Sequence, residues 1–478
     1  MAVVIAHEIC SMGVRFNPGS FFLCERVGDN SLLPDLDNRF KPTDISCMKN
    51  RLNCLIVSTL LLPVLLSCQS ETTVKTGVWR ATLQTNGGEL PFGLDIQPGT
   101  KPGTYAVFAL NGAERLPMDT ATLTGDTLRI PMALFESELV AKVDGEKLTG
   151  SWRKRRVKND YQVVPFAATF GDGPRFGQAQ QAGSKGGPAS GQAVPAASVG
   201  GKWQTVFRAA GTDGAPGDTT AAVGVFEQKG NKVTGTFLTP TGDYRYLAGN
   251  VFGDSLLLSC FDGSHAFLFK ARLGGAKETQ TLTGVFHSGP TYRETWTARP
   301  NANASLPDPA ELTYLKPGQK FTFAFPDASG KTVSLADERF KNKVTVVQIL
   351  GSWCPNCMDE TRFLAPWYAK NKGRGVEVVG LAFEKTTDLA ESGPKLTRMS
   401  QRFQIQYPVL LAGTNDKAEA SKSLPALSGV VAFPTTVFVD KKGQVRHIYT
   451  GFSGPGTGVY YDQFVGDFNR LIDKLLAE

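Results

Sequence analysis

Apolar and polar residues alternate in two different ways along this chain of 478 residues. Residues 76–170 and 201–299 hold short runs with a period of two, divided by Gly, Asp and Asn turns, as is typical of antiparallel strands. About eight strands fit in each stretch, which suits a small barrel or sandwich. Residues 307–478 instead combine continuous apolar runs with helical periodicity. The pattern therefore predicts a multi-domain protein in which an all-β region precedes an α/β domain.

Short motifs recur in the same order in the two β-type stretches, which indicates a duplication. The paired motifs are Gly77–Trp79 with Gly201–Trp203, Gly125–Leu128 with Gly253–Leu256, and Leu148–Gly150 with Leu282–Gly284. The Gly-x-Trp opening resembles that of lipocalin-like barrels. Residues 171–200, rich in Gly, Ala, Gln, Ser and Pro, are expected to be a flexible linker, and residues 300–306 a second linker. We expect the β-region to be a spacer or docking module; a small apolar ligand inside it is the alternative.

Two cysteines lie three positions apart where an apolar run meets a helical pattern. The run Val344–Leu350 is rich in β-branched residues, and apolar residues recur at helical spacing after Cys357. Cys354 is therefore expected to cap a helix that begins at Pro355. The unpaired N–H groups and the helix dipole there favour a thiolate, so Cys354 is expected to be the exposed nucleophile and Cys357 the resolving thiol. Such a pair exchanges dithiol for disulfide without a cofactor.

An inert disulfide and half of a zinc site are the alternative interpretations of this pair. A structural zinc ion takes four ligands, and no second paired motif accompanies the cysteines. His265, His287 and His447 are isolated, and Cys260 has only His265 nearby. Neither a metal nor a cofactor is therefore predicted.

Residues 307–478 resemble the thioredoxin superfamily, and within it the TlpA-like and ResA-like thiol-disulfide oxidoreductases of bacterial envelopes. The motifs that carry the resemblance are Trp353–Cys357, the leading segment 317–335, the buried run Val376–Glu384 and the loop Ala432–Thr436. The resemblance implies a thioredoxin fold with a cis peptide bond before Pro434. It also implies that Cys354 and Cys357 form a redox-active disulfide and that Trp353, Phe433 and Thr435 line the substrate groove.

Two positions bear on proton transfer and on redox direction. The buried aspartate that thioredoxins commonly carry six residues before the first cysteine is Gln348 here. Glu384 matches a position where the family often has an active-site glutamate, so the resemblance implies a proton-handling role; a solvated residue at a strand end is the alternative. The dipeptide Pro355–Asn356 is neither that of thioredoxins nor that of strong oxidants, which leaves the direction of electron flow open.

The segment Met48–Cys68 has the pattern of an export signal. Basic residues near its start precede an apolar run, Leu55–Leu66, that is too short for a convincing membrane span. The ending Leu65–Cys68 resembles a bacterial lipobox, which implies cleavage before Cys68 and lipidation of its thiol. We therefore expect residues 48–67 to be a lipoprotein signal peptide and 68–75 a tether, with translation starting at Met48 and residues 1–47 lying outside the native protein. An ordinary signal peptide is the alternative.

Composition limits the classes of partner that the chain is expected to bind. The chain has 51 basic and 44 acidic residues, and this mild excess does not argue for nucleic acid. The dense basic cluster Arg153–Arg156 interrupts a strand pattern and predicts a solvated turn, with anionic lipid as a minor alternative. The four cysteines that remain after residue 67 are too few for a disulfide-stapled scaffold.

The sequence thus predicts a thiol-disulfide oxidoreductase that is lipid-anchored in the cell envelope and faces the periplasm. By resemblance, its partners are disulfide-bearing envelope proteins, including apocytochromes, and a membrane electron donor. A peroxiredoxin is excluded because the Pro-x-x-x-Thr/Ser-x-x-Cys loop is missing: counted back from Cys357, its positions hold Leu350 and Cys354. A disulfide oxidase or isomerase remains open, as does a non-enzymatic lipoprotein that binds a ligand or client.

Overall fold

The computed structural model describes residues 72–157, 160–177, 197–211, 217–276 and 279–478. Residues Gln69–Glu478 form one compact unit. The predicted leader at 1–47, the signal peptide at 48–67 and the anchor residue Cys68 lie outside the described residues. Within the part that is described, no helix is both long and apolar enough to cross a membrane.

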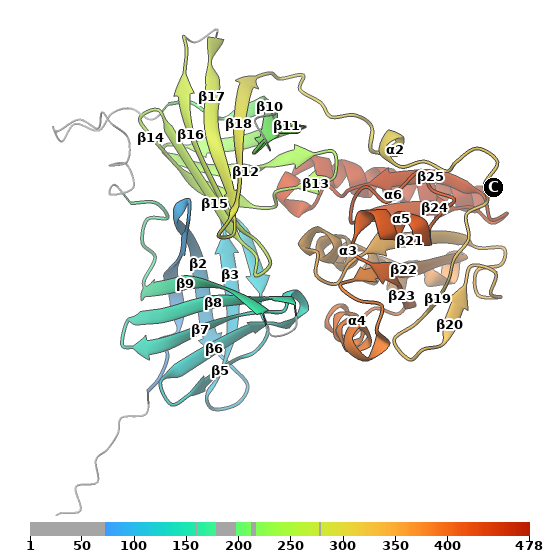
Figure 1. Ribbon diagram of the computed structural model, residues 1–478, viewed down its shortest axis with the longest axis horizontal. Helices are drawn as coiled ribbons and strands as arrows, with labels where there is room; N and C mark the ends of the chain where they lie inside the picture. Colours follow the sequence, from blue (N-terminus) through green and yellow to red (C-terminus); the bar gives the residue numbers. More distant parts are fainter. Residues whose placement is uncertain (1–71, 158–159, 178–196, 212–216, 277–278) are drawn as a thin grey trace, which may run out of the picture. The chain divides into compact units, whose positions relative to one another are not determined.

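The first β-type stretch folds into an antiparallel sheet that closes on itself (Figure 1). The sheet runs β2-β1-β9-β8-β7-β6-β5-β3-β4, and the additional pairing of β2 with β3 closes the ring and leaves the short β4 as an appendage on β3. Its strands are β1 (Gly77–Thr85), β2 (Gly88–Pro98), β3 (Thr104–Asn111), β4 (Glu114–Pro117), β5 (Ala121–Thr124), β6 (Thr127–Met132), β7 (Ser137–Asp144), β8 (Lys147–Val157) and β9 (Asp160–Phe170).

The second stretch repeats this topology strand for strand. Its order is β11-β10-β18-β17-β16-β15-β14-β12-β13, closed by the pairing of β11 with β12. The motifs that recur in the sequence occupy equivalent places, in β1 and β10, at the β5–β6 and β14–β15 turns, and in β8 and β17. The strands are β10 (Gly201–Ala209), β11 (Thr219–Lys229), β12 (Lys232–Thr239), β13 (Gly242–Asp243), β14 (Leu247–Phe252), β15 (Ser255–Phe261), β16 (Ala266–Gly274), β17 (Thr281–Ser288) and β18 (Tyr292–Pro300).

Aromatic side chains fill the second barrel. The ring of Phe237 is fully buried, and its centroid lies 5.0 to 5.2 Å from those of four other rings. The four are Phe207, Phe226, Phe269 and Trp296. Rings of this size bury a large apolar area, so the barrel interior supplies a packed core rather than an obvious ligand chamber.

Segments predicted to be tether and linker pack against the barrels at their described ends. Val74, in the predicted tether, is 4% exposed, and its N–H donates to the Tyr105 hydroxyl at 3.1 Å. In the predicted linker 171–200, Phe176 is buried in the core of the first barrel and Val199 in that of the second. In the predicted linker 300–306, Ala304 is buried against the second barrel. Single apolar residues thus anchor stretches whose overall composition is that of a flexible chain.

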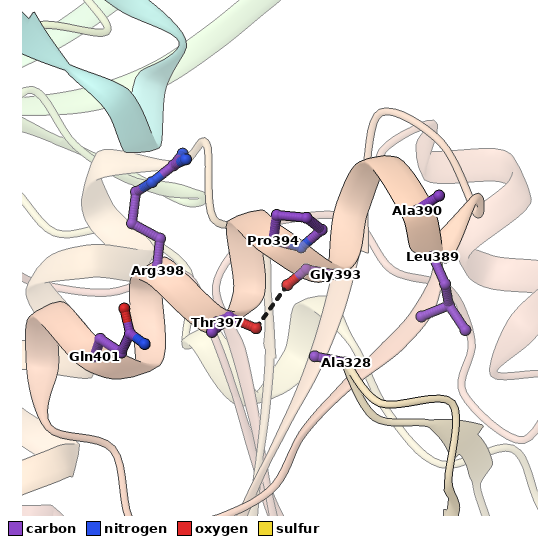
Figure 2. A pocket seen from close by; sticks show the side chains of 8 residues that line it. All are labelled: Ala328, Leu389, Ala390, Gly393, Pro394, Thr397, Arg398 and Gln401. Carbon is purple, nitrogen blue, oxygen red and sulfur yellow. Dashed lines mark hydrogen bonds between the residues drawn. The ribbon is translucent and has the colours of Figure 1, made fainter. Parts of the chain in front are cut away.

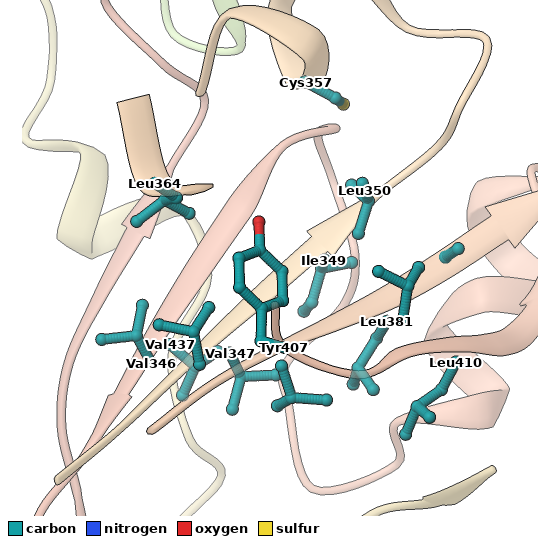
Figure 3. Packing of buried hydrophobic residues seen from close by; sticks show 14 of the residues in the cluster. Val346, Val347, Ile349, Leu350, Cys357, Leu364, Leu381, Tyr407, Leu410 and Val437 are labelled. Atoms are coloured by element: carbon teal, nitrogen blue, oxygen red, sulfur yellow. The ribbon is translucent and has the colours of Figure 1, made fainter. Parts of the chain in front are cut away.

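The C-terminal domain is a five-stranded mixed sheet with helices, in the order β23-β22-β21-β24-β25. Strands β21 (Val344–Leu350) and β22 (Val376–Glu384) are buried along their whole length and pair in parallel. Strands that are buried along their whole length need cover on both faces of the sheet. Figure 3 shows part of the resulting core, with Cys357 at its edge and Tyr407 among the side chains of β21, β22 and β24.

The remaining elements complete this domain. Cys354 and Cys357 lie at the start of α3 (Pro355–Asn371), which follows β21. The other elements are α2 (Pro309–Leu312), β19 (Ala324–Pro326), β20 (Thr332–Ser334), α3 (Pro355–Asn371), α4 (Leu389–Phe403), β23 (Val409–Thr414), α5 (Lys417–Ser423), β24 (Thr435–Val439), β25 (Val445–Thr450) and α6 (Val459–Ala477).

The first barrel contacts the C-terminal domain through ion pairs at α4 and the end of β22. Arg402 of α4 pairs with Asp119 and donates to the Pro117 carbonyl at 2.6 Å. Arg155 of β8 bridges Glu136 of its own barrel and Glu391 of α4. The expectation of a solvated turn at Arg153–Arg156 was therefore wrong, because these residues continue strand β8 and two acidic partners neutralise Arg155.

Candidate active site

The strand-to-helix junction places the two thiols. Cys354 has extended backbone angles and is the N-cap of α3, with Pro355 as the first helical residue. Its sulfur accepts a hydrogen bond from the Cys357 N–H at 3.2 Å, in the position where a capping side chain satisfies an unpaired amide. An anionic sulfur at this place also interacts favourably with the helix dipole. The geometry therefore suits a reactive thiolate at Cys354.

The two thiols differ in their surroundings. Cys357 is fully buried, and burial, with smaller contributions from Cys354 and Glu360, raises the pKa of its thiol well above the ordinary value. Cys354 is only 7% exposed, so the expectation of an exposed nucleophile was wrong. Its Sγ lies 3.5 Å from the Phe433 carbonyl oxygen, which covers one side of it. A client must therefore reach a sulfur that is nearly enclosed.

The loop before strand β24 packs against the thiols. The Phe433–Pro434 peptide bond is cis, as the sequence context predicts. The ring of Phe433 contacts that of Trp353 edge to face, with centroids 5.7 Å apart, and the Trp353 indole N–H donates to the Phe383 carbonyl at 2.8 Å. Thr435 is fully buried and its hydroxyl donates to the Ala432 carbonyl at 2.9 Å. Of the three predicted groove residues, Trp353 and Phe433 retain some exposed surface, whereas the side chain of Thr435 faces inward.

Glu384 lies at the end of β22 and is 1% exposed, which excludes the alternative of a solvated strand end. Its carboxylate accepts hydrogen bonds from the Ser352 N–H at 2.8 Å and the Ser352 hydroxyl at 2.9 Å. Burial raises the pKa of Glu384, and the two bonds from Ser352 oppose that rise. Glu384 thus holds the loop that precedes Cys354. Its described hydrogen bonds reach Ser352 rather than either thiol.

Glu360 is a buried carboxyl that the sequence analysis did not identify. It lies three residues after Cys357 on α3, accepts from Gln348 Nε2 at 2.8 Å and from the Thr436 hydroxyl at 2.5 Å, and is fully buried. Burial raises its pKa to about 7, and the bonds from Thr436 and Gln348 only partly oppose that rise. Gln348 Nε2 also donates to the Cys357 carbonyl at 3.4 Å. The spacing from Cys357, one helical turn, was the available signal.

The other candidate sites lack the features of a catalytic or metal-binding site. No group of three or more His, Cys, Asp or Glu residues in the described part of the chain is arranged to hold a metal ion. Cys260 is fully buried, and burial raises the pKa of its thiol well above the ordinary value. A pocket of about 580 Å³ lies along α4, and Ala328 also lines it (Figure 2). Its lining includes Pro394, Thr397 and Arg398 but neither redox cysteine.

Comparisons with known proteins find similarity in the C-terminal domain. Residues 316–462 match the Redoxin family. The chain is 31% identical over 124 residues to the thiol-disulfide oxidoreductase ResA of Bacillus thuringiensis subsp. konkukian, which covers 26% of this chain and 62% of the relative. It is 29% identical over 129 residues to the thiol:disulfide interchange protein DsbE of Allochromatium vinosum, covering 27% of this chain and 63% of the relative.

A solved structure, a thiol:disulfide interchange protein of the thioredoxin family from Chlorobium tepidum TLS, aligns with 34% of this chain and 99% of its own length at 23% identity and a TM-score of 0.26. The match to the first curated relatives spans less than two thirds of their length. The match to the Redoxin family and the similarity to the ResA and DsbE proteins therefore both concern the C-terminal part of the chain.

Proposed function

We propose that this protein is a thiol-disulfide oxidoreductase that reduces disulfides of other proteins through Cys354 and Cys357. The observation that carries the proposal is that two thiols with different surroundings lie together at the start of one helix. The Cys354 sulfur caps α3 and accepts the Cys357 N–H at 3.2 Å, while Cys357 is fully buried one turn along the helix. The names of the ResA and DsbE relatives support the same chemistry.

The reaction takes two exchange steps. In the first, the Cys354 thiolate attacks one sulfur of a client disulfide, forms a mixed disulfide and releases the other client sulfur as a thiolate, which takes up a proton. In the second, Cys357 loses its proton and attacks the Cys354 sulfur, so the second client thiol leaves and takes up a proton. The client gains two electrons and two protons, and the pair ends as the Cys354–Cys357 disulfide. A membrane electron donor would then reduce that disulfide for the next cycle.

Glu360 is the group we assign to the Cys357 proton. The second step needs a base, because burial raises the pKa of the Cys357 thiol. Glu360 lies one turn further along α3, and its pKa of about 7 lets it accept and release a proton near neutral pH. This assignment replaces the expected role of Glu384, which we propose to be a positioning residue for the loop before Cys354 through its two bonds to Ser352.

We further propose the location and partners that the sequence pattern favours. Cleavage before Cys68 and lipidation of that residue would hold the protein on a membrane of the cell envelope, facing the periplasm. Clients would be disulfide-bearing envelope proteins, with apocytochromes as one class. Lipidation is tested by mass spectrometry of the mature N-terminus and by a Cys68→Ala variant, which should move the protein from the membrane to the soluble fraction.

The redox function is tested by trapping. In Cys357→Ala the second step is blocked, so mixed disulfides between Cys354 and clients should accumulate and disappear on addition of dithiothreitol. The matched control is Cys354→Ala, which should trap nothing. Binding of the same proteins in both variants would point instead to a non-enzymatic binding protein and would overturn the proposal.

The direction of electron flow is tested by the reduction potential of the pair in dithiothreitol buffers. A value near about −270 mV, as in thioredoxin, is expected for a reductase, whereas one near about −120 mV would make the protein an oxidant of folding clients.

A further inference from the structure

A loop of the second barrel lies directly on the start of the redox helix. Asn356, inside the Cys-x-x-Cys motif, donates through Nδ2 to the Asp243 carbonyl at 3.1 Å. Arg245 donates to the Pro355 carbonyl at 3.4 Å and forms an ion pair with Asp359 of α3. Pro355 is buried in consequence. The dipeptide between the two cysteines is therefore covered by a domain more than a hundred residues earlier in the chain.

The same barrel covers the loop that follows β25. The Asp243 carboxylate accepts from the Gly454 N–H at 2.7 Å. At Gly451, which has φ +81°, an added Cβ would lie 2.9 Å from the Thr241 carbonyl carbon, so the two backbones are in direct contact. On a third side, the Ser264 hydroxyl lies 3.4 Å from the Trp353 carbonyl oxygen. The second barrel thus touches three segments that surround the thiols.

This contact is fixed by buried charge. Arg245 is 2% exposed and pairs with Glu114 of the first barrel, Asp262 of the second barrel and Asp359 of α3. Separating the barrel from α3 would break the Arg245–Asp359 ion pair, whose two side chains are only 2% and 7% exposed. Breaking a pair that is buried in this way is costly in a low-dielectric interior. The covered arrangement is therefore a specific docking rather than a loose contact.

The second barrel does not cover the loop that contains Pro434, which lies on the remaining side of the thiols. Val431 is 37% exposed, and the Phe433 carbonyl lies 3.5 Å from the Cys354 sulfur. Among the described residues, no hydrogen bond or ion pair links either barrel to Val431–Thr435. A client disulfide would therefore have to reach Cys354 across this loop, and a rigid folded surface would meet the docked barrel before it reached the sulfur.

We propose that the second barrel acts as a size filter, so that the Cys354–Cys357 pair accepts disulfides in extended segments or small molecules and excludes disulfides on folded surfaces. This inference rests on the proposed redox function and adds the class of substrate. The filter consists of the β12–β14 connection, Pro240–Tyr246, docked on α3 and on the loop after β25.

The test compares two substrates with the reduced full-length protein. One is a short unstructured peptide with an internal disulfide, and the other is a stable folded protein with a surface disulfide. The variants Asp243→Ala and Arg245→Met weaken the docking, and Arg402→Gln is the matched control, because it breaks an ion pair with the first barrel at α4. Each rate is divided by that of the wild type with the same substrate, so the intrinsic reactivity of the two disulfides cancels.

Weakened docking should speed reduction of the folded protein by about tenfold or more, equivalent to about 1.4 kcal/mol, and change the peptide rate little. Arg402→Gln should change neither rate. Equal rates for the folded protein in all variants, with normal peptide reduction, would overturn the filter and leave the redox function standing. Failure of the wild type to reduce the peptide would overturn the redox function and the filter with it.

A second measurement needs no variant and so does not depend on folding of the changed proteins. Cys354 of the reduced wild type is alkylated with a small maleimide and with the same maleimide on a bulky polymer, and the labelled peptide is quantified by mass spectrometry. The filter predicts a rate at least about tenfold lower for the bulky reagent than for the small one, after correction with a free thiol peptide. Equal corrected rates would overturn the proposal.

Discussion

Glu360 gives the most specific prediction, because its raised pKa makes the stability of the redox domain depend on pH. The pKa of about 7 exceeds the ordinary value of 4.5, which means that the folded domain holds a proton that the unfolded chain has already released. Between these two pH values the folded state binds more protons, so the free energy of unfolding falls as pH rises. The penalty is absent below pH 4.5 and complete above about pH 7.

The size of the effect follows from the same values. A difference of about 2.5 on the pH scale corresponds to about 3 kcal/mol at about 1.36 kcal/mol per pH unit. Glu360→Gln removes the titration and keeps the shape: its amide oxygen can accept from Gln348, and its NH₂ can donate to the Thr436 hydroxyl. Relative to the wild type, the variant should therefore gain about 3 kcal/mol of stability between pH 4.5 and pH 8.

The assay must report on one domain of a multi-domain chain. Urea unfolding under reducing conditions, followed by a brief protease pulse and quantification of peptides from 344–477, gives the free energy of unfolding for the redox domain alone. Glu377→Gln is a control of opposite sign. Burial favours a higher pKa for Glu377, but bonds from Lys343, Tyr368 and Arg339 outweigh it and lower the pKa.

Loss of Glu377 should therefore destabilise the domain most at neutral pH and least at acidic pH, where its carboxylate is protonated in both states.

A constant difference between Glu360→Gln and the wild type from pH 4.5 to pH 8 would refute the reasoning, because it would mean that Glu360 does not titrate in this range.

Three further predictions concern packing and access. Ser352→Ala removes the hydroxyl that donates to Glu384 at 2.9 Å and should lower the stability of the redox domain by about 1–3 kcal/mol in the same protease assay; an unchanged value would mean that water replaces the hydroxyl. Phe237→Ala removes the central ring of the second barrel and should cost about 3–5 kcal/mol of barrel stability, measured on peptides from 201–300; a cost below 1 kcal/mol would show that the ring is not close-packed. Cys260 is fully buried and should stay unlabelled by iodoacetamide in the native reduced protein while Cys354 reacts; labelling of both at similar rates would contradict the described burial.

The sequence predicted most of the fold because its signals are local. The Trp353–Cys357 motif, the β-branched run before it and the recurrent motifs of the barrels each lie within a few residues, and turn and cap chemistry translates them directly into structure. Barrel closure could not be predicted in the same way, since it depends on the pairing of β1 with β9, the first and last strands of the barrel.

Long-range charge pairs were missed for a related reason. Arg245 and Asp359 are separated by more than a hundred residues, and each looks like a solvated surface residue in its local context. Arg155 was assigned to a turn because four adjacent basic residues are unusual in a strand, and its acidic partners come from distant segments. Glu360 was overlooked among polar neighbours of α3, although its spacing from Cys357 placed it on the same helix face.

The two barrels share one topology, but they dock on the redox domain through contacts of opposite charge. Equivalent connections, β4–β5 in the first barrel and β13–β14 in the second, both contact the redox domain. The first presents an anion, Asp119, to Arg402 of α4, whereas the second presents a cation, Arg245, to Asp359 of α3. If the copies exchanged places, like charges would meet at both contacts. A duplicated module can thus keep one fold in both copies and still encode which copy belongs where, by reversing the sign of a single side chain.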